Sequence, residues 1–343
     1  MITELIKKRN LPPLADKEEM LDVLLREEYG YLPKHTAVSF SQQKVPSACK
    51  NLFGGKALRQ NVLVSASFGD AEFSFPIEIT VPNKEGKHPF FVYISFVTAL
   101  SSVYCPLEEI IDNGFGVAKV NYTDVTSDDA DFTNGLAGVL FKNGKRTETD
   151  PGKISMWAWA ASRALDYLET TDFADIDKVT VCGHSRLGKT ALVAAATDTR
   201  FFCAHSNNSG CSGAALARDN QGETVGVITK NFPYWFCENY YKYAENEKEM
   251  PFDQHFLIAS IAPRKVYVSS ASEDLWADPE NEFLSCVAAS PAFEKGFVHE
   301  NAVPSPFTKL HSGDVGYHIR YGRHFHSRQD WQCCMEFVKS KFI

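Results

Sequence analysis

The chain has 343 residues, of which 44% are apolar, and its 43 acidic and 35 basic side chains give a formal net charge of −8. This length and composition can bury a large core, while the acidic balance argues against nucleic acid or an anionic membrane as a partner. No apolar run is long enough to span a membrane, and the amino terminus lacks the apolar centre of a signal peptide, so we expect a cytoplasmic protein. Nine cysteines without metal-ligand spacing predict reduced, buried thiols and no metal site.

Residues 1–85 are predicted to form a helical arm followed by antiparallel strands. Asp16 to Glu28 places apolar residues at helical spacing, and the Gly30 and Pro33 that follow favour the end of a helix. Residues 37–82 alternate apolar and polar side chains, as strands with one buried face do. We therefore expect these strands at one side of a larger sheet.

Residues 86–343 are predicted to form a doubly wound core, so that residues 1–343 make one catalytic domain. The continuous apolar run from Phe90 to Ile94 indicates a strand that is buried on both faces. Further helices are expected over 106–113, 154–169, 251–264 and 329–342, and further strands over 116–120, 178–183, 265–271 and 316–320. Residues 204–213 are expected to form a short strand that ends in a glycine-rich loop. This alternation of strands and helices is typical of an α/β fold with a mostly parallel sheet.

The polar segment 124–149 contains the acidic cluster Asp128-Asp129-Ala130-Asp131. Such a cluster could suggest calcium, but its spacing lacks the glycine and the terminal glutamate of an EF-hand loop. We therefore expect a solvated loop here.

The stretch Gly183-His184-Ser185-Arg186-Leu187-Gly188-Lys189 lies between a predicted strand and an alanine-rich helix. A tight turn at this place lifts the hydroxyl of Ser185 above the sheet, with a helix N-terminus behind it, and predicts a nucleophile. Leu187 stands where the usual Gly-x-Ser-x-Gly motif has its second glycine, and the alternative is that Ser185 only caps the helix. Arg186 and Lys189 argue against that alternative, because the helix dipole disfavours each cation there by up to about 1 kcal/mol.

This stretch resembles the Gly-Cys/His-Ser-Arg-x-Gly-Lys turn of the glucuronoyl esterase family. Those carbohydrate esterases have the α/β-hydrolase fold and cleave the ester between 4-O-methyl-glucuronate on xylan and an alcohol of lignin. Other similar segments, which extend the resemblance from about Asp16 to Trp331, are the turn from Tyr29 to Pro33, Trp157-Ala158-Trp159, and Gly322-Arg323-His324 with Asp330-Trp331. The resemblance implies a three-layer α/β-hydrolase sandwich with a mostly parallel central sheet, and no metal or organic cofactor.

A catalytic serine needs a histidine as base and a carboxylate to orient that base. In this fold the order along the chain is serine, acid, histidine, each after a strand. The base is expected at His324, just past the last strand, with His318 and His326 as alternatives; the resemblance also favours His324.

Asp274 follows the strand that ends at Ala271, and Glu273 and Asp278 compete with it for the role of the acid. The resemblance to bacterial family members favours Asp274. Fungal members take a glutamate from the position of Asn208 instead. An amide cannot stabilise an imidazolium as a carboxylate does, so Asp274 is expected to act alone.

The resemblance also implies roles around the substrate. The loop over residues 95–100 and the backbone of Arg186 would form the oxyanion hole, with support from the Arg186 side chain. Lys189 and Glu223 would hydrogen-bond sugar hydroxyls, and Trp276 would contact the sugar ring. The alternatives are that Lys189 is solvated, Glu223 a surface acid and Trp276 part of the core.

These features together predict a serine-type carbohydrate esterase for esters of (4-O-methyl-)glucuronate or a related uronic acid. The substrate is expected to be an imported small-molecule or oligosaccharide ester, since a cytoplasmic enzyme cannot meet polymeric lignin. An acetyl xylan esterase, or another sugar-ester deacetylase, is the alternative within the same class. A non-catalytic sugar-binding homologue is the alternative from a different class.

Overall fold

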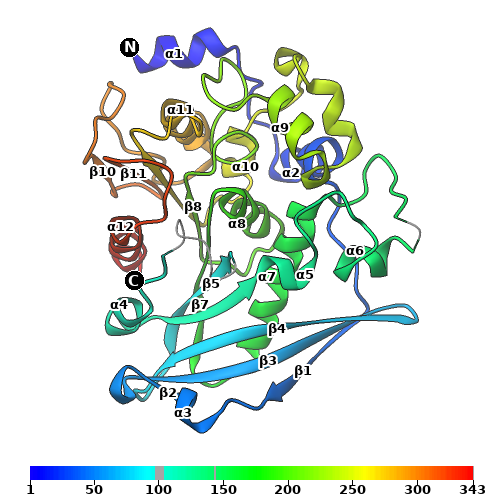
Figure 1. The fold of residues 1–343 in the computed structure, drawn as a ribbon. Coiled ribbons are helices and arrows are strands. Elements are labelled where there is room, and N and C mark those ends of the chain that lie inside the picture. Colours follow the sequence, from blue (N-terminus) through cyan, green and yellow to red (C-terminus); the bar gives the residue numbers. More distant parts are fainter. Residues whose placement is uncertain (97–103, 143, 343) are drawn as a thin grey trace.

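The computed structural model describes residues 1–96, 104–142 and 144–342, and one sheet runs through this part of the chain (Figure 1). The sheet has eleven strands in the order β1-β3-β4-β6-β5-β7-β8-β9-β11-β10, with β2 paired to β3. The strands are β1 (Ala37–Gln43), β2 (Asn51–Leu52), β3 (Ala57–Phe68), β4 (Ala71–Pro82), β5 (His88–Ser95), β6 (Gly116–Asn121), β7 (Ala174–His184), β8 (Cys203–Asn207), β9 (Lys265–Ala271), β10 (Lys309–Leu310) and β11 (Val315–Arg320).

The pairing divides the sheet into a parallel centre and antiparallel edges. The strands β6, β5, β7, β8, β9 and β11 pair in parallel. The early strands β1, β3 and β4 pair antiparallel, and β4 joins the parallel centre by pairing antiparallel with β6. The sequence-based prediction of antiparallel strands beside a parallel core is confirmed.

Helices cover both faces of the sheet. The α-helices are α1 (Ile2–Arg9), α2 (Lys17–Leu24), α3 (Ser47–Lys50), α4 (Leu107–Asp112), α5 (Tyr122–Val125), α6 (Gly135–Leu140), α7 (Lys153–Glu169), α8 (Arg186–Thr197), α9 (Val225–Asn231), α10 (His255–Ala259), α11 (Pro279–Ala289) and α12 (Arg328–Ser340). A π-helical turn, η1 (Leu25–Tyr29), follows α2, and the 3-10 helices are η2 (Phe53–Gly55), η3 (Pro233–Trp235), η4 (Glu238–Tyr243), η5 (Glu247–Glu249) and η6 (Ser290–Ala292). In Figure 1, α4 and α12 lie on one side of the central strands, and α7 and α8 on the other.

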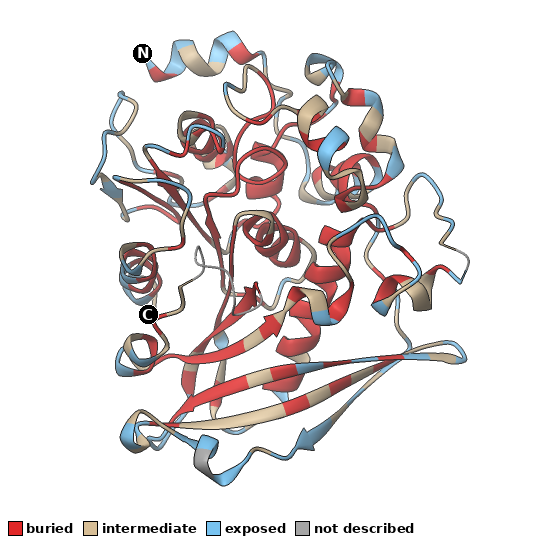
Figure 2. Ribbon diagram, viewed as in Figure 1, coloured by how far each residue is buried: buried red, intermediate tan, exposed pale blue. Residues whose placement is uncertain are grey.

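The strand β5 shows how the sequence produces these three layers. Alternate side chains of a strand point to opposite faces. Phe90 and Val92 belong to the core on the side of α7 and α8, whereas Phe91 and Tyr93 belong to the core on the side of α4 and α12. The continuous apolar run is therefore buried on both faces, as predicted, and Figure 2 shows burial concentrated in these central elements.

Several parts of the chain differ from the prediction. The helix expected over 251–264 is only α10, because the carboxylate of Asp253 accepts hydrogen bonds from the backbone N–H groups of Ala217, Arg218 and Gln254, which holds the chain in a turn before it. The segment 124–149, expected as a solvated loop, contains α6. The α-helices α1, α3, α5, α9 and α11 were not predicted.

Within the described ranges, no helix combines the length and the apolar character that crossing a bilayer requires. The nine cysteines are all free, and burial raises the pKa of each of the seven buried thiols. Those seven therefore stay protonated and pack as small apolar side chains.

Candidate active site

The turn between β7 and α8 holds Ser185 in an unusual backbone conformation, with φ 59° and ψ −129°. A Cβ at Gly183 would lie 2.1 Å from the carbonyl oxygen of Leu187, so only glycine fits where the helix folds back on the strand. A Cβ at Gly188 would lie 3.1 Å from both Ser206 Oγ and Ser209 Cβ. The close approach of helix to sheet thus occurs at Gly188, which explains why a leucine is tolerated at position 187.

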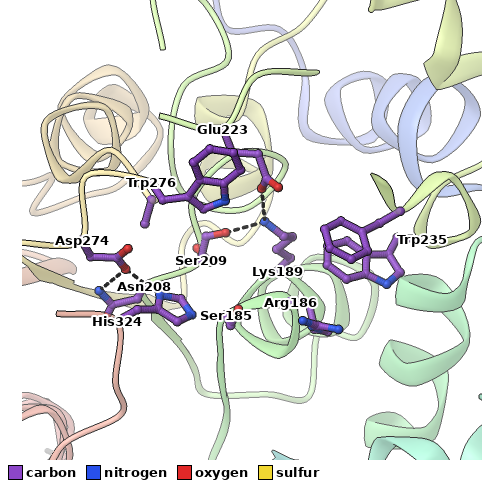
Figure 3. Close-up of a pocket in the computed structure, with 13 residues that line it drawn as sticks. Ser185, Arg186, Lys189, Asn208, Ser209, Glu223, Trp235, Asp274, Trp276 and His324 are labelled. Carbon is purple, nitrogen blue, oxygen red and sulfur yellow. Dashed lines mark hydrogen bonds and ion pairs between the residues drawn. The ribbon is translucent and has the colours of Figure 1, made fainter. Parts of the chain in front are cut away.

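Four consecutive parallel strands bring the site together at their carboxyl ends. Ser185 follows β7, Asn208 follows β8, Asp274 lies three residues after β9, and His324 lies four residues after β11. These strands are neighbours in the order β7-β8-β9-β11, so their ends meet at one edge of the sheet. All four side chains line the same pocket, which has a volume of about 350 Å³ (Figure 3).

The carboxylate of Asp274 holds the imidazole of His324. Nδ1 of His324 lies 2.6 Å from Oδ2 of Asp274, and the amide of Asn208 donates to the same oxygen. Burial acts to raise the pKa of Asp274, but the hydrogen bond from His324 and the donor from Asn208 outweigh it and leave this pKa below its usual value. Asp274 therefore remains ionised and accepts a hydrogen bond from Nδ1 of His324, which leaves Nε2 outside this contact and available as a base.

The serine and the imidazole face the same space. In Figure 3 the hydroxyl of Ser185 lies beside the ring of His324, although among the described residues none forms a hydrogen bond with this hydroxyl. Catalytic hydrogen bonds of this kind are often long in the unliganded state and shorten when substrate binds. The arrangement has the order and the grouping of a serine, histidine and aspartate triad.

The alternative acids and bases have other partners. His318 lies in β11 and bonds Tyr267 and Asp330, while His326 is fully buried. Asp278 caps α11 by accepting from the backbone N–H of Asn281. Neither these three side chains nor Glu273 is among the described residues that line the pocket.

A second histidine, His184, packs against the ring of His324. The rings of His184 and His324 have centroids 4.4 Å apart, and Nδ1 of His184 donates to Oδ1 of Asn207 across 2.6 Å. Burial, and then the charge of His324, lowers the pKa of His184 to about 3. His184 is therefore neutral at physiological pH. It does not repel a positive charge that forms on His324.

Lys189 and Glu223 are buried side by side in the pocket wall. Nζ of Lys189 donates to the carbonyls of Ser209, at 2.6 Å, and Cys211, and it lies 3.9 Å from Oε2 of Glu223. Burial raises the pKa of Glu223 against the opposing charge of Lys189. The alternatives of a solvated lysine and a surface acid are therefore wrong.

Trp276 stands at the mouth of the same pocket. The residue is 56% exposed, so it is not part of the core. Its backbone carbonyl accepts a hydrogen bond from the N–H of Glu223, which ties the two pocket walls together. An exposed indole beside buried hydrogen-bonding groups is the arrangement that a sugar ring requires.

Arg186 has partners that the sequence did not reveal. Its guanidinium pairs with Asp128, and its Cζ atom lies 4.6 Å from the centre of the Trp235 ring. Trp235 stacks on Phe232, with ring centroids 4.0 Å apart, and both line the pocket. The prediction that the segment around Asp128 is a solvated loop is wrong for this residue, because its side chain is only 11% exposed.

The backbone N–H of Arg186 can form one side of an oxyanion hole. The first N–H groups of a helix have no acceptor within it, so the N–H of Arg186 is available to an oxyanion beside Ser185. The other expected donor belongs to the loop 95–100, of which residues 97–100 lie outside the described residues.

Comparison with known proteins decides the family. A family model described as fungal glucuronyl esterase matches residues 64–295. The chain belongs to the glucuronoyl esterase family. The resemblance drawn from the turn around Ser185 is thereby confirmed, and so is the α/β-hydrolase fold of this family member.

Individual relatives agree with that family. A carbohydrate esterase from an unknown prokaryotic organism is 43% identical over 240 residues, which make up 68% of this chain and 55% of that protein. The 4-O-methyl-glucuronoyl methylesterase of Podospora anserina is 30% identical over 275 residues, 76% of this chain and 51% of that protein. A solved glucuronoyl esterase from Solibacter usitatus has a TM-score of 0.86 at 33% identity, covering 95% of this chain and 92% of that one. The family member described here spans about half the length of the curated relatives it matches.

Proposed function

We propose that this chain is a serine esterase that hydrolyses esters of (4-O-methyl-)glucuronate or a related uronic acid. The observation that carries the proposal is the meeting of Ser185, Asp274 and His324 in one pocket, with the hydrogen bond of 2.6 Å between the last two. Membership of the glucuronoyl esterase family supports the same reaction.

The reaction proceeds in two steps. Oγ of Ser185 attacks the ester carbonyl while Nε2 of His324 takes its proton, and Asp274 stabilises the imidazolium that forms. The bond to the alcohol oxygen breaks, and His324 returns the proton to that oxygen. A water molecule deprotonated by His324 then attacks the acyl-enzyme and releases the uronic acid with Ser185 restored.

The pocket walls suit a sugar acid. The ester of a uronic acid is uncharged and carries several hydroxyl groups, which need donors, acceptors and an aromatic face. Lys189 and Glu223 provide a donor and an acceptor, and Trp276 provides the aromatic face. The acyl part of an acetyl ester carries no hydroxyl group, so only the sugar on its alcohol side could use these groups, whereas the acyl part of a uronate ester is itself the sugar; this favours a uronate ester as the substrate.

Product analysis with the variant Ser185→Ala tests the proposal. We expect wild-type protein to release methanol from methyl glucuronate, and the variant to lose several orders of magnitude in turnover while keeping its fold by circular dichroism. Release of acetate from acetylated xylan oligomers, without methanol release, would support the deacetylase instead. Failure of the wild-type serine to react with a fluorophosphonate probe would support a silent sugar-binding homologue.

A further inference from the structure

Asp128 is the side chain around which one wall of the pocket is assembled. Its carboxylate pairs with the guanidinium of Arg186, accepts from Nε1 of Trp235 at 2.7 Å and accepts from the hydroxyl of Tyr122 at 3.0 Å. These partners come from α8, η3 and α5, which lie far apart in the sequence. A single carboxylate thus ties three separate segments together behind the pocket.

The pairing restricts how Arg186 can act. In the described part of the chain, the only hydrogen bond of its side chain goes to Asp128, and the guanidinium lies against the Trp235 ring. Arg186 follows the nucleophile directly, and both line the pocket (Figure 3). Asp128 therefore holds one edge of the guanidinium and leaves its other N–H groups without a hydrogen-bond partner among the described residues.

The pairing also sets the charge of the pocket. Arg186 is matched by Asp128 and Lys189 by Glu223, while His324 is held by Asp274. No permanent cation among the described lining residues is thus without a carboxylate partner. Hydrolysis converts a neutral ester into a carboxylate, which these acids repel at close range.

We propose that Asp128 is a positioning residue for Arg186: it orients the guanidinium towards the developing oxyanion and cancels its charge, so that the pocket favours the neutral ester over its carboxylate product. The inference rests on the proposed esterase function. Without Asp128, the guanidinium would be mobile in the transition state and free to hold the product.

The variant Asp128→Asn tests both effects, because it keeps the shape of the side chain and removes its charge. We expect kcat for methyl glucuronate to fall on the order of tenfold with little change in KM. We also expect free glucuronate to inhibit the variant several-fold more strongly than wild-type protein. A purely structural role would lower the amount of active enzyme without strengthening product inhibition.

The matched control is Asp129→Asn, since Asp129 is the exposed neighbour and, among the described residues, bonds only Ser127 and the backbone of Asp131. We expect Asp129→Asn to leave both kcat for methyl glucuronate and the inhibition by free glucuronate unchanged. Tyr122→Phe removes one hydrogen bond to Asp128 from outside the pocket, and we expect a smaller change in the same direction. If Asp128→Asn does not fold, the kinetics of Tyr122→Phe test the inference in its place.

Equal kinetics for Asp128→Asn and Asp129→Asn, or a loss of kcat without tighter glucuronate inhibition, would overturn the inference. Measurements with p-nitrophenyl acetate as substrate and acetate as inhibitor separate this result from failure of the uronate proposal. If wild-type protein hydrolyses only the acetyl ester, the uronate proposal fails. The role of Asp128 is then still tested by comparing Asp128→Asn with wild-type protein in kcat for the acetyl ester and in inhibition by acetate.

Discussion

The side-chain amide of Asn208 donates a hydrogen bond of 2.9 Å to Oδ2 of Asp274, the same oxygen that lies 2.6 Å from Nδ1 of His324. Asn208 has φ 46°, in the left-handed region that asparagine tolerates better than most residues. Where fungal family members are expected to carry a second acid, this chain has a donor that stabilises the ionised form of the first. The two positions therefore cooperate, but only one supplies charge.

Asp274→Asn is expected to be far more damaging than Asn208→Ala. The first change removes the charge that stabilises the imidazolium and should lower kcat by about 10³- to 10⁴-fold. The second removes one donor and should lower kcat by only about two- to fivefold. Steady-state kinetics with methyl glucuronate measure both, and the reverse ranking would show that the acid is wrongly assigned.

The same pair gives a pH dependence with a definite sign. The lowered pKa of Asp274 keeps it ionised as the pH falls, and Asn208 contributes to that lowering. Asn208→Ala removes the contribution, so the pKa of Asp274 should rise and activity should be lost at a higher pH on the acid side. A profile of kcat/KM between pH 4 and 8 measures this shift. If wild-type protein and Asn208→Ala lose activity at the same acidic pH, the prediction is contradicted.

Trp276→Ala should weaken substrate binding without affecting the fold. The side chain is 56% exposed, so its loss should change the free energy of unfolding by less than about 0.5 kcal/mol. KM for methyl glucuronate should rise several-fold because the sugar loses its aromatic face, while KM for p-nitrophenyl acetate should not change. Leu275→Ala is the control, since Leu275 is 70% exposed and does not line the pocket; equal effects of the two variants on KM would refute the role of Trp276.

Glu282 should make folding stability depend on pH. This fully buried acid accepts from the backbone N–H groups of Ser209 and Gly210 and from Ser270, and burial raises its pKa to about 8. Between its unfolded pKa, about 4.3, and about 8, the folded state binds more protons than the unfolded state. The free energy of unfolding therefore falls as the pH rises through this window, by up to ~1.4 kcal/mol per pH unit.

Glu282→Gln cannot titrate, so we expect it to gain stability relative to wild-type protein from pH 5 to pH 8. Urea unfolding at four pH values measures the difference. Glu280→Gln is the control on the same helix, because the side chain of Glu280 is 44% exposed. Parallel curves for wild-type protein and Glu282→Gln would show that Glu282 is ionised in the folded state throughout.

The fold was predictable where local signals are strong, and less so where they are weak or fit two interpretations. The apolar run in β5 and the small and apolar residues of α8 have clear periodicity, so both were predicted. The helix α11 also carries a start signal, Asp278 before Pro279, in which the carboxylate caps the first turn. The signal is ambiguous in the sequence, because an acidic residue in a loop that follows a strand fits a catalytic role equally well.

The sequence by itself determined the nucleophile turn and the order of Ser185, Asp274 and His324, because each follows a recognisable strand and the order belongs to the fold. Only the tertiary structure decided which groups support them. Asp128 meets Arg186 across 58 positions, and Asn208 meets Asp274 across 66. Such contacts depend on the paths of irregular loops, whose sequences have no periodicity to reveal them, whereas the ends of parallel strands are brought together by the sheet itself.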